Sequence, residues 1–557
     1  MKKITLLIVL LLAIDFSYGQ ILTFDFNGNV GNEASVNSNS NDAGLTFSTI
    51  TRGAGLSANN NANSFNSQDW ALTSIANAVA GNNYVEFTLT PNTGFQFDVT
   101  TIIIDFYRSG TGVRGLALRS SVDSYSTDID SEKTVIDNTN LQSFSFTVSQ
   151  SNNNTAVTYR LYGWSELTGG SGRFESGGND IEVNGAVSPL NSCASVSTWD
   201  GTSWDVAPSS TAVAVIDGNY TATTANSLSV CGLYINAVST ITGNPVIVRV
   251  DNGGYIEVQN DVTVDGTLIV ETQGNFVQRG NTGTFTNNGI SRVNKTTANK
   301  ADWFYYTYWS SPVVGETVED AFPNVDGDRR FWFNAANFID TDGDDIDDDA
   351  NDWQAASGTM LPGVGYASTE ARLFSAFAPA TGTASFEGIF NTRDVGVTIS
   401  ENAANVAVGS TSWNFIGNPY PSAIDFNAFH AANSTVVGGA AYFWSQVTDP
   451  DESNSGNEDK NFSKNDYAIY TVASGGVVAG AGGIMPDQYI PSSQGFFIAG
   501  IDNNTATFTN AMRMADGTSN AQFFRNSSSK KKTANPNTNR LWVNLTTDNG
   551  VFNQILV

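Results

Sequence analysis

Short alternations of apolar and polar residues recur through the first third of this chain, and they constrain its fold more than any other feature. Clear examples are 22–26, 84–89, 102–106 and 144–148, which are separated by turns rich in Asn, Gly and Ser. A period of two is typical of strands with one buried face, whereas stretches with the helical period of about 3.6 are nearly absent. We therefore predict an all-β protein with an antiparallel β-sandwich over residues 20–190.

The length and composition agree with this prediction. A chain of 557 residues is too long for one hydrophobic core, and a usual domain size of about 150 residues predicts three or four domains. Aromatic residues make up 11% of the chain and charged residues only 14%, while 52 residues are Gly. This balance favours strands and turns over helices.

Residues 194–300 have a different pattern, because their strands are shorter and each ends at or near Gly, Asn or Asp. Examples are 214–216, 246–248, 255–258 and 267–270. Recurrence on this scale predicts a β-solenoid, whose stacked rungs bury each other's apolar faces. The region has room for about four or five rungs of ~20–25 residues.

The first 19 residues predict a secretory signal peptide. Lys2 and Lys3 precede an unbroken apolar run over residues 6–14, and small residues follow at the positions that a signal peptidase reads. The run is shorter than the ~20 residues of a membrane-spanning helix, so we expect a secreted or cell-surface protein without a transmembrane segment in the mature chain.

Charge and cysteine content narrow the function further. The chain has 26 basic and 54 acidic side chains and a net charge of −28, which disfavours nucleic acid as a partner and leaves carboxylates free for cations.

The two cysteines, Cys193 and Cys231, form either one disulfide or a free buried pair.

Residues 301–525 predict a further β-rich domain, and a family resemblance rests on blocks within it. The blocks are Tyr-Trp-Ser-Ser-Pro-Val at 308–313, Gly-Asn-Pro-Tyr-Pro-Ser at 417–422 and Gln-Gly-Phe-Phe at 494–497, after a Thr-Trp-Asp-Gly opening at 198–201. In this order they resemble large surface proteins of Flavobacteria and other Bacteroidetes that the type IX secretion system exports. The segments 160–164, 169–173 and 179–183 are similar to the closing strands of a jelly-roll module found on such proteins.

The resemblance implies an N-terminal jelly roll that binds glycan or another surface, a central solenoid and a C-terminal β-rich domain. It also implies the type IX secretion machinery as a partner. Proteins of this group usually end in a sorting domain. Here residues 526–539 read as a polar, basic linker and residues 540–557 as the start of a further β domain, which we expect to be truncated.

The stretch 340–352 is the strongest candidate for a metal site. Carboxylates at alternate positions are typical of calcium loops, which supply six to eight oxygens at ~2.3–2.6 Å. The residues expected to bind structural Ca²⁺ are Asp340, Asp342, Asp344, Asp347, Asp348 and Asn351. The stretch departs from those loops at one position, because Asp345 stands where an EF-hand loop has its turning glycine, and aspartate adopts a positive φ only at some cost. The alternative is a solvated acidic loop, which is how we interpret the second acidic stretch, 449–459.

Two aromatic stripes could bind sugar or pack in the core. One is the run 303–309, in which a strand would place aromatic rings on both faces, a pattern that favours burial. The other is Arg160, Tyr162 and Trp164 in the sandwich, for which the same two interpretations hold.

The sequence contains few side chains that are suited to a catalytic role. His430 is the one histidine of the chain, so a multi-histidine zinc site is impossible and we expect a surface or capping role for this ring. Carboxylate-only hydrolysis or elimination is possible in principle, and the solenoid carries scattered acids, Asp251, Glu257, Asp261, Asp265 and Glu271.

The leading hypothesis is a non-catalytic, calcium-stabilised protein of the cell exterior that adheres to or binds an extracellular glycan or surface. One alternative is a secreted polysaccharide-degrading enzyme, a glycoside hydrolase or lyase that uses carboxylates. The other is a structural spacer that displays a further module.

Overall fold

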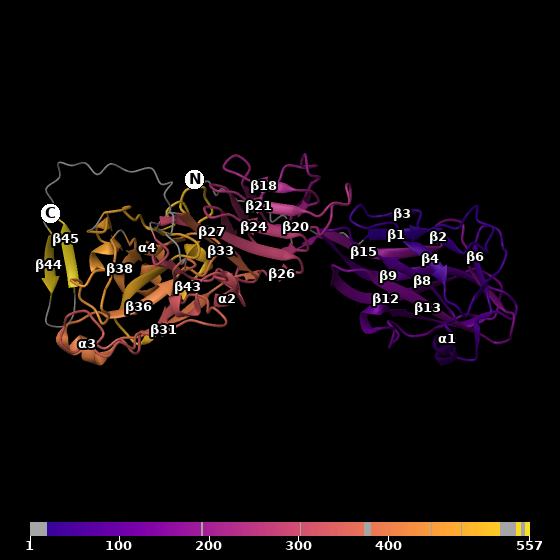
Figure 1. Ribbon diagram of the computed structural model, residues 1–557. Helices are drawn as coiled ribbons and strands as arrows, with labels where there is room; N and C mark the ends of the chain where they lie inside the picture. Colours follow the sequence, from indigo (N-terminus) through magenta and orange to yellow (C-terminus); the bar gives the residue numbers. More distant parts are fainter. Residues whose placement is uncertain are drawn as a thin grey trace, which may run out of the picture. The chain divides into compact units, whose positions relative to one another are not determined.

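The computed structural model describes residues 19–190, 193–300, 302–372, 380–446, 448–480, 482–523, 542–546 and 552–556. The chain divides into two compact units, Met1–Ser192 and Cys193–Val557, each of which is described by itself. Strands dominate both units, and the α-helices of the described residues are at most 8 residues long. The predicted all-β fold class is therefore confirmed (Figure 1). The predicted signal peptide, apart from Gly19, and the predicted linker lie outside the described residues.

The first unit is a sandwich of two mainly antiparallel sheets (Figure 1). The first sheet has the spatial order β3 (Ser40–Asn41), β1 (Gly19–Phe24), β15 (Ile181–Pro189), β9 (Phe95–Arg108), β14 (Ser171–Phe174), β6 (Phe65–Gln68) and β5 (Ser57–Ala58), with β12 (Gln142–Asn153) also paired to β9. The second has the order β11 (Lys133–Thr134), β10 (Val113–Ser120), β13 (Val157–Ser165), β8 (Tyr84–Leu89), β4 (Thr49–Arg52) and β2 (Ser35–Asn37), with β7 (Ala71–Leu72) parallel to β13.

The alternation of apolar and polar residues in the sequence determines which side chains form the core of the sandwich. In β9 the side chains of Ile102, Ile104 and Phe106 are at most 1% exposed, while the residues between them are only partly buried. Phe24, Phe65 and other apolar side chains from both sheets complete one continuous cluster. Burial of alternate residues follows because successive side chains of a strand point to opposite faces.

One buried acid makes the stability of the sandwich depend on pH. Asp180 is 2% exposed, and burial raises its pKa to about 6 against a hydrogen bond from the Phe26 N–H that favours the charged form. The folded state therefore binds a proton more tightly than the unfolded state. Between about pH 4 and pH 6 this carboxyl costs stability as the pH rises, and the loss is complete above pH 6.

We expect Asp180→Asn to raise the free energy of unfolding of the sandwich at pH 7 by about 1–2 kcal/mol, since a shift of about two pKa units corresponds to at most ~3 kcal/mol. At pH 4 the variant and the wild type should differ little. Thermal melts of the full chain at both pH values measure this. An equal difference at pH 4 and pH 7 would show that the titration of Asp180 is not the cause.

The second unit begins with three ladders of parallel strands, which we call the coil region (residues 195–300). The first ladder has the order β16 (Ser195–Trp199), β17 (Ala212–Ile216), β20 (Gly232–Ile235), β23 (Val262–Val264) and β26 (Phe285–Asn287). The second has β18 (Tyr220–Ala222), β21 (Ile247–Val250), β24 (Thr267–Val270) and β27 (Ile290–Lys300), and the third has β19 (Leu228–Val230), β22 (Tyr255–Val258) and β25 (Asn275–Gln278).

Successive strands of each ladder of the coil region pair in parallel, so that apolar side chains stack from one turn of the chain to the next. Ile256, for example, pairs with Leu228 on one side and Phe276 on the other, and all three are at most 3% exposed. Figure 1 shows β18, β21, β24 and β27 side by side. The apolar side chains of neighbouring strands in a ladder therefore bury one another.

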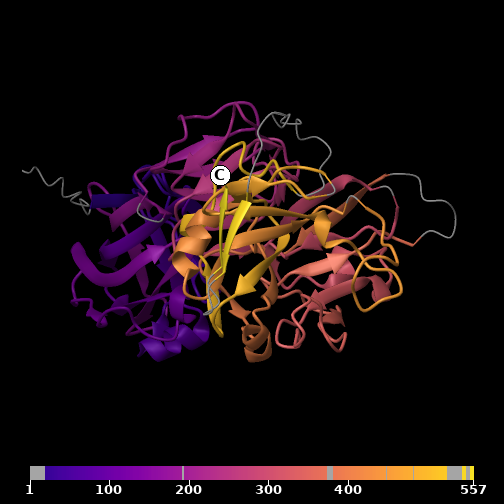
Figure 2. The same ribbon diagram turned by 90° about the vertical axis from the view of Figure 1, so that its left-hand side faces the viewer.

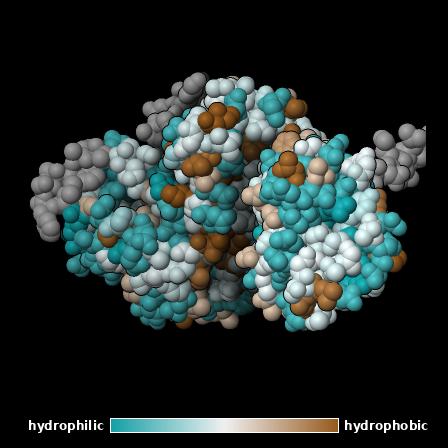
Figure 3. Space-filling model, turned by 90° about the vertical axis from the view of Figure 1, so that its right-hand side faces the viewer, coloured by the Kyte–Doolittle hydropathy of each residue, from teal (hydrophilic) through white to brown (hydrophobic). Residues whose placement is uncertain are grey.

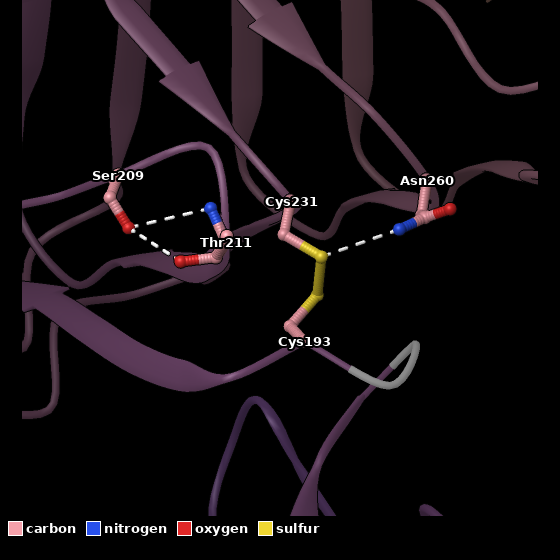
Figure 4. Close-up of a disulfide and its surroundings, with 5 residues drawn as sticks. All are labelled: Cys193, Ser209, Thr211, Cys231 and Asn260. Atoms are coloured by element: carbon pink, nitrogen blue, oxygen red, sulfur yellow. Dashed lines mark hydrogen bonds between the residues drawn. A yellow bond between two sulfur atoms is a disulfide. The ribbon is translucent and has the colours of Figure 1, made fainter. Parts of the chain in front are cut away.

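A disulfide closes the start of the second unit. Cys193 precedes β16 and Cys231 precedes β20, and their sulfur atoms are bonded (Figure 4). Asn260 Nδ2 donates a hydrogen bond to Cys231 Sγ at 3.3 Å. Of the two possibilities that the sequence left open, the disulfide is therefore the one that the structure contains.

The rest of the second unit, from Thr307 to Phe523, contains two larger sheets. The four-stranded sheet has the order β28 (Thr307–Trp309), β32 (Tyr366–Ser368), β30 (Arg330–Phe333) and β31 (Trp353–Ala355). The five-stranded sheet has the order β36 (Ser412–Gly417), β42 (Gly495–Gly500), β38 (Val437–Trp444), β39 (Tyr467–Thr471) and β40 (Gly475–Val477). Orange and yellow strands lie side by side in Figure 2, because β42 inserts between β36 and β38.

Short pairs and helices complete this part of the unit. β33 (Ala380–Glu387) pairs with β27 at the edge of the sheet that contains the second ladder. The two-stranded pairs are β29 (Val313–Val314) with β34 (Ile389–Phe390), β35 (Val395–Ile399) with β43 (Asn504–Phe508), and β37 (Ile424–Asp425) with β41 (Tyr489–Ile490). After Phe523, β44 (Trp542–Thr546) pairs with β45 (Phe552–Leu556). The helices are α2 (Val318–Ala321), α3 (Ala403–Val408) and α4 (Phe426–Asn433).

The three sequence blocks of residues 301–525 meet where the coil region joins the following sheets. Gln494 Nε2 donates to the carbonyl of Tyr308 at 3.2 Å, and the N–H of Asn418 donates to the carbonyl of Gln494 at 3.0 Å. A Cβ on Gly417 would lie 2.5 Å from Cβ of Ser310, so only glycine allows this approach. The blocks that carried the family resemblance therefore have a structural role.

The coil region and the following sheets share one hydrophobic core. Phe276 of β25 and Phe285 of β26 both contact Phe390, with ring centroids 5.4 and 5.2 Å apart, and Trp309 contacts Phe523 at 5.3 Å. Residues 194–300 and 301–525, which the sequence predicted as two domains, both belong to the compact unit Cys193–Val557.

Candidate functional site

The acidic loop brings three of its six predicted metal ligands together. Carboxylate oxygens of Asp340, Asp342 and Asp348 all lie within 4.8 Å of one another. Asp340 is fully buried, and its two oxygens accept hydrogen bonds from the N–H groups of Gly343 (2.6 Å) and Asp345 (2.8 Å). Asp348 accepts from the N–H of Thr341 at 2.9 Å. Hydrogen bonds therefore hold two of the three carboxylates in place.

The other three predicted ligands lie outside this group. Asp347 is 2% exposed and accepts from the N–H groups of Ile339 and Asn351, while Asp344 accepts from the N–H of Ile346. The side-chain oxygen of Asn351 is buried without a hydrogen-bond partner in the described part of the chain. Asp345 has φ of +64°, in the left-handed region that favours glycine.

Crowding of like charges is visible in the pKa values of the loop. The pKa of Asp342 is raised, chiefly by the negative charge of Asp344. Burial alone would raise the pKa of Asp340, but hydrogen bonds from Ser410 and from backbone N–H groups outweigh it and lower the pKa below its ordinary value. A cation beside Asp340, Asp342 and Asp348 would relieve the repulsion, and carboxylate oxygens are the ligands that calcium prefers.

The aromatic run 303–309 packs mainly in the core. A strand forms only over Thr307–Trp309, because residues 303–304 lie in a turn. Tyr305, Tyr308 and Trp309 are between 2% and 7% exposed. Trp303 is half-buried and lies beside the guanidinium groups of Arg329 and Arg372, at 5.6 and 5.2 Å from its ring.

The acids of the coil region make contacts between neighbouring turns of the chain. Glu257 pairs with Arg279 at 2.6 Å, and Asp261 accepts from the N–H of Thr284 at 2.6 Å. Glu271 pairs with Arg249. These acids therefore join neighbouring strands of the coil region.

His430 lies in the last turn of α4 and is partly exposed, and burial lowers its pKa.

A groove of about 570 Å³ lies on the second sheet of the sandwich. The side chains that matter most for its chemistry are Arg114, Glu132, Ile136, Asp137, Trp164 and Glu166. They come from β10, the end of β13 and the segment around β11. The groove therefore combines an aromatic ring with several charged groups.

Close packing fixes the position of Trp164. Its indole N–H donates to Glu132 Oε1 at 2.6 Å, and its cross-strand neighbour is Gly115. A Cβ on Gly115 would lie 2.3 Å from Trp164 Nε1 and 2.1 Å from Glu132 Oε1. The indole can occupy this position only because residue 115 has no side chain.

The rest of the predicted stripe is covered by other side chains. Tyr162 is 2% exposed and packs with Tyr84 and with α1 (Ile75–Gly81). The Arg160 guanidinium lies over the rings of Tyr84 (4.2 Å) and Tyr125 (3.8 Å) and pairs with Glu86. Within the stripe, Trp164 alone lines the groove, whereas Arg160 and Tyr162 pack against other residues.

Ion pairs hold the charged groups at the rim of the groove. Arg114 pairs with Asp137 (2.7 Å) and with Glu166, both of which are more than half exposed. Hydrogen bonds from Arg114 and then from Arg108 lower the pKa of Asp137. Asp137 is thus held in its ionised form, which suits it to accept hydrogen bonds from a ligand rather than to donate a proton.

Sequence reasoning singled out Trp164 but missed its partners. Arg114, Glu132, Asp137 and Glu166 are isolated charges in separate strands and turns of the sequence, and only the pairing of β10 with β11 and β13 brings them together. No strong pattern in the sequence therefore indicated the groove. In Figure 3 the visible surface is largely hydrophilic, with hydrophobic residues in small separate patches.

The comparisons with known proteins identify one family. Residues 194–557 match the family described as Domain of unknown function (DUF8693). No curated protein matches the sequence. Within the described residues, none of the helices has the length and apolar character needed to cross a membrane.

Two solved structures show weak similarity. The N-terminal cellulose-binding domain of Cellulomonas fimi β-1,4-glucanase C is 11% identical, with 29% of this chain and 91% of that domain covered and a TM-score of 0.14. The catalytic unit of the GH87 α-1,3-glucanase of Streptomyces thermodiastaticus is 12% identical, with 40% of this chain and 54% of that one covered and a TM-score of 0.11. At such TM-scores the likenesses carry no functional argument.

Proposed function

The chain belongs to the DUF8693 family, and we propose that it is a non-catalytic protein of the bacterial cell exterior that binds glycan through the groove on its sandwich. The observation that carries this proposal is Trp164, an indole held beside a row of charged side chains in an open groove. A sugar ring has an apolar face of C–H groups and a rim of hydroxyls. The indole can cover the apolar face, and the carboxylates can accept hydrogen bonds from the hydroxyls.

Export to the cell surface or the medium belongs to the same proposal. It is supported by the N-terminal apolar segment of the sequence and by the disulfide between Cys193 and Cys231, which persists in oxidising compartments. Export by a type IX route rests on the family resemblance of the sequence. Adhesion to glycan would then occur outside the cell.

Binding of the purified full chain to a glycan array tests the glycan proposal. We expect Trp164→Ala to weaken binding to the recognised glycans at least ten-fold, or about 1.4 kcal/mol, because the apolar face of the sugar loses its partner. The control is Phe47→Ala, which removes an aromatic side chain that is 68% exposed on the same unit and does not line the groove.

Three outcomes would contradict the proposal. Absence of glycan binding would leave the spacer hypothesis. Equal loss of binding in both variants would place the site elsewhere. Release of reducing sugars or unsaturated products from the bound glycan would show an enzyme.

We further propose that the acidic loop holds a structural Ca²⁺ at Asp340, Asp342 and Asp348. Chelation should then lower the melting temperature of the full chain, because a ligand present at 100 times its Kd stabilises the folded state by about 2.7 kcal/mol. Asp342→Asn should abolish the response to calcium. Asp349→Asn, which changes an exposed acid of the same loop outside the cluster, should preserve it.

Melting curves with and without chelator, together with mass spectrometry of the bound ion, measure the calcium effect. A melting temperature unchanged by chelation, with no ion retained in the native protein, would refute the calcium site.

A further inference from the structure

We infer that the groove of the sandwich selects uncharged, hydroxyl-rich glycans and rejects polyanionic ones. This inference rests on the proposed glycan binding and names its ligand class. Its basis is the arrangement of five charged side chains: Arg108, Arg114, Glu132, Asp137 and Glu166.

The first step concerns the positive charges, which are already engaged. Arg114 donates through Nε to Glu166 at 2.9 Å, and its Nη2 lies 2.7 Å from Asp137. The Arg108 side chain is fully buried, pairs with Asp137 and donates to the carbonyl of Gly110 at 3.0 Å. A ligand carboxylate or sulfate would have to displace two protein carboxylates to reach Arg114.

The second step concerns Glu132, whose negative charge is not balanced. Its Oε1 accepts from the Trp164 indole, and Glu132 forms no ion pair within the described part of the chain. The groove therefore has three carboxylates against two guanidinium groups. A charged ligand group of the same sign, held next to the indole, would be repelled by Glu132.

The third step concerns what these groups can bind. Carboxylate oxygens accept hydrogen bonds but cannot donate them when ionised, so they match the O–H donors of sugar hydroxyls. Thr134 can donate or accept, and Ile136, which is 63% exposed, adds apolar surface beside Trp164. Hydroxyls, together with the apolar face of a neutral sugar, can contact all of these groups without bringing a further negative charge into the groove.

The net charge of the chain adds to this selectivity. At −28 the protein repels polyanions over a Debye length, which is about 10 Å at 0.1 M salt. This long-range repulsion weakens as salt is added, and because Glu132 is itself exposed to solvent, salt also screens its repulsion of a bound anionic group. Selectivity against polyanions should therefore be strongest at low salt.

The test is an array of neutral, uronate-bearing, sulfated and amino-bearing glycans, which is probed with the full chain at about 0.05 M and at about 0.5 M salt. We expect neutral glycans to bind at least ten-fold more tightly than uronate or sulfate counterparts of the same linkage at the lower salt concentration, and by a smaller factor in the same direction at the higher one. We expect Glu132→Gln, whose amide oxygen can still accept from the indole, to reduce this preference at least three-fold. Glu182→Gln, on β15 of the opposite sheet, is the matched control and should keep the preference.

The outcomes separate the two proposals. If no class of glycan binds, the proposed function itself fails. If glycans bind through Trp164 but polyanionic glycans bind as tightly as neutral ones, glycan binding stands and the inference on ligand class is overturned. A preference unchanged by Glu132→Gln would also overturn it.

Discussion

Replacing Arg513 with alanine lowers the free energy of unfolding of the second unit by about 3–5 kcal/mol, the scale of an interrupted buried charge network. The side chain is 1% exposed. Its guanidinium donates to the carbonyls of Phe276 (2.8 Å) and Gln278 (3.3 Å) and to Asn510 Oδ1 (3.0 Å). These acceptors would lose their donor in a place that water reaches poorly.

Arg513 matters because of where its partners lie. Phe276 and Gln278 belong to β25, the last strand of the third ladder in the coil region, whereas Asn510 follows β43. The arginine therefore joins the end of the coil region to the sheets beyond it. Burial lowers its pKa to about 9, so the group is still charged at neutral pH.

Urea unfolding of the full chain at pH 7 measures the effect of Arg513. Arg292→Ala is the matched control, since it removes an arginine whose side chain is 37% exposed and pairs with Glu387, and it should cost less than about 1 kcal/mol. Arg513→Lys should recover only part of the loss, because an ammonium cannot reach acceptors in several directions at once. Equal effects of Arg513→Ala and Arg292→Ala would contradict the role described for Arg513.

The second large effect is expected from removing the disulfide. The double variant Cys193→Ser, Cys231→Ser should lower the free energy of unfolding by about 4 kcal/mol, the loop-entropy value for two cysteines 38 residues apart. The variant loses the covalent link between the start of the unit and β20, and β16 is then held in the ladder by its pairing with β17. Replacing both cysteines avoids a free thiol.

Denaturant unfolding of the double variant, with the reduced wild-type protein as a second comparison, measures the effect of the disulfide. Both should be destabilised by similar amounts. A variant within about 1 kcal/mol of the oxidised wild type would mean that the ladder hydrogen bonds alone hold β16 in place, since bonds of this kind contribute about that much each.

The strands could be predicted from the sequence because their signal is local. The alternation at Ile102, Ile104 and Phe106 follows from two-sided strand geometry, and the structure buries these residues as expected. The short strands of the coil region also have a local signal in the sequence, because apolar residues occur over a few positions and end at turns. The strand predicted for the run 303–309 is shorter in the structure, because aromatic composition does not show where a turn begins.

The candidate sites were predicted less completely because they depend on tertiary pairing. Alternating Asp residues predicted the acidic loop, but the backbone directs Asp347 to cap N–H groups while Asp340, Asp342 and Asp348 converge. In the sandwich, Trp164 lines the groove because Gly115 lies beside it on β10. Glu132 and Glu166 are unremarkable in the sequence, and their meeting around Trp164 depends on which strands are neighbours.

The most direct test of glycan binding by the sandwich is hydrogen–deuterium exchange of the full chain with and without a neutral glycan from the array. The account predicts slower exchange in three segments that line the groove, 113–116, 132–137 and 164–166, and no such change in Trp164→Ala. Protection confined to residues 193–557, or protection of the same segments that persists in Trp164→Ala, would contradict it.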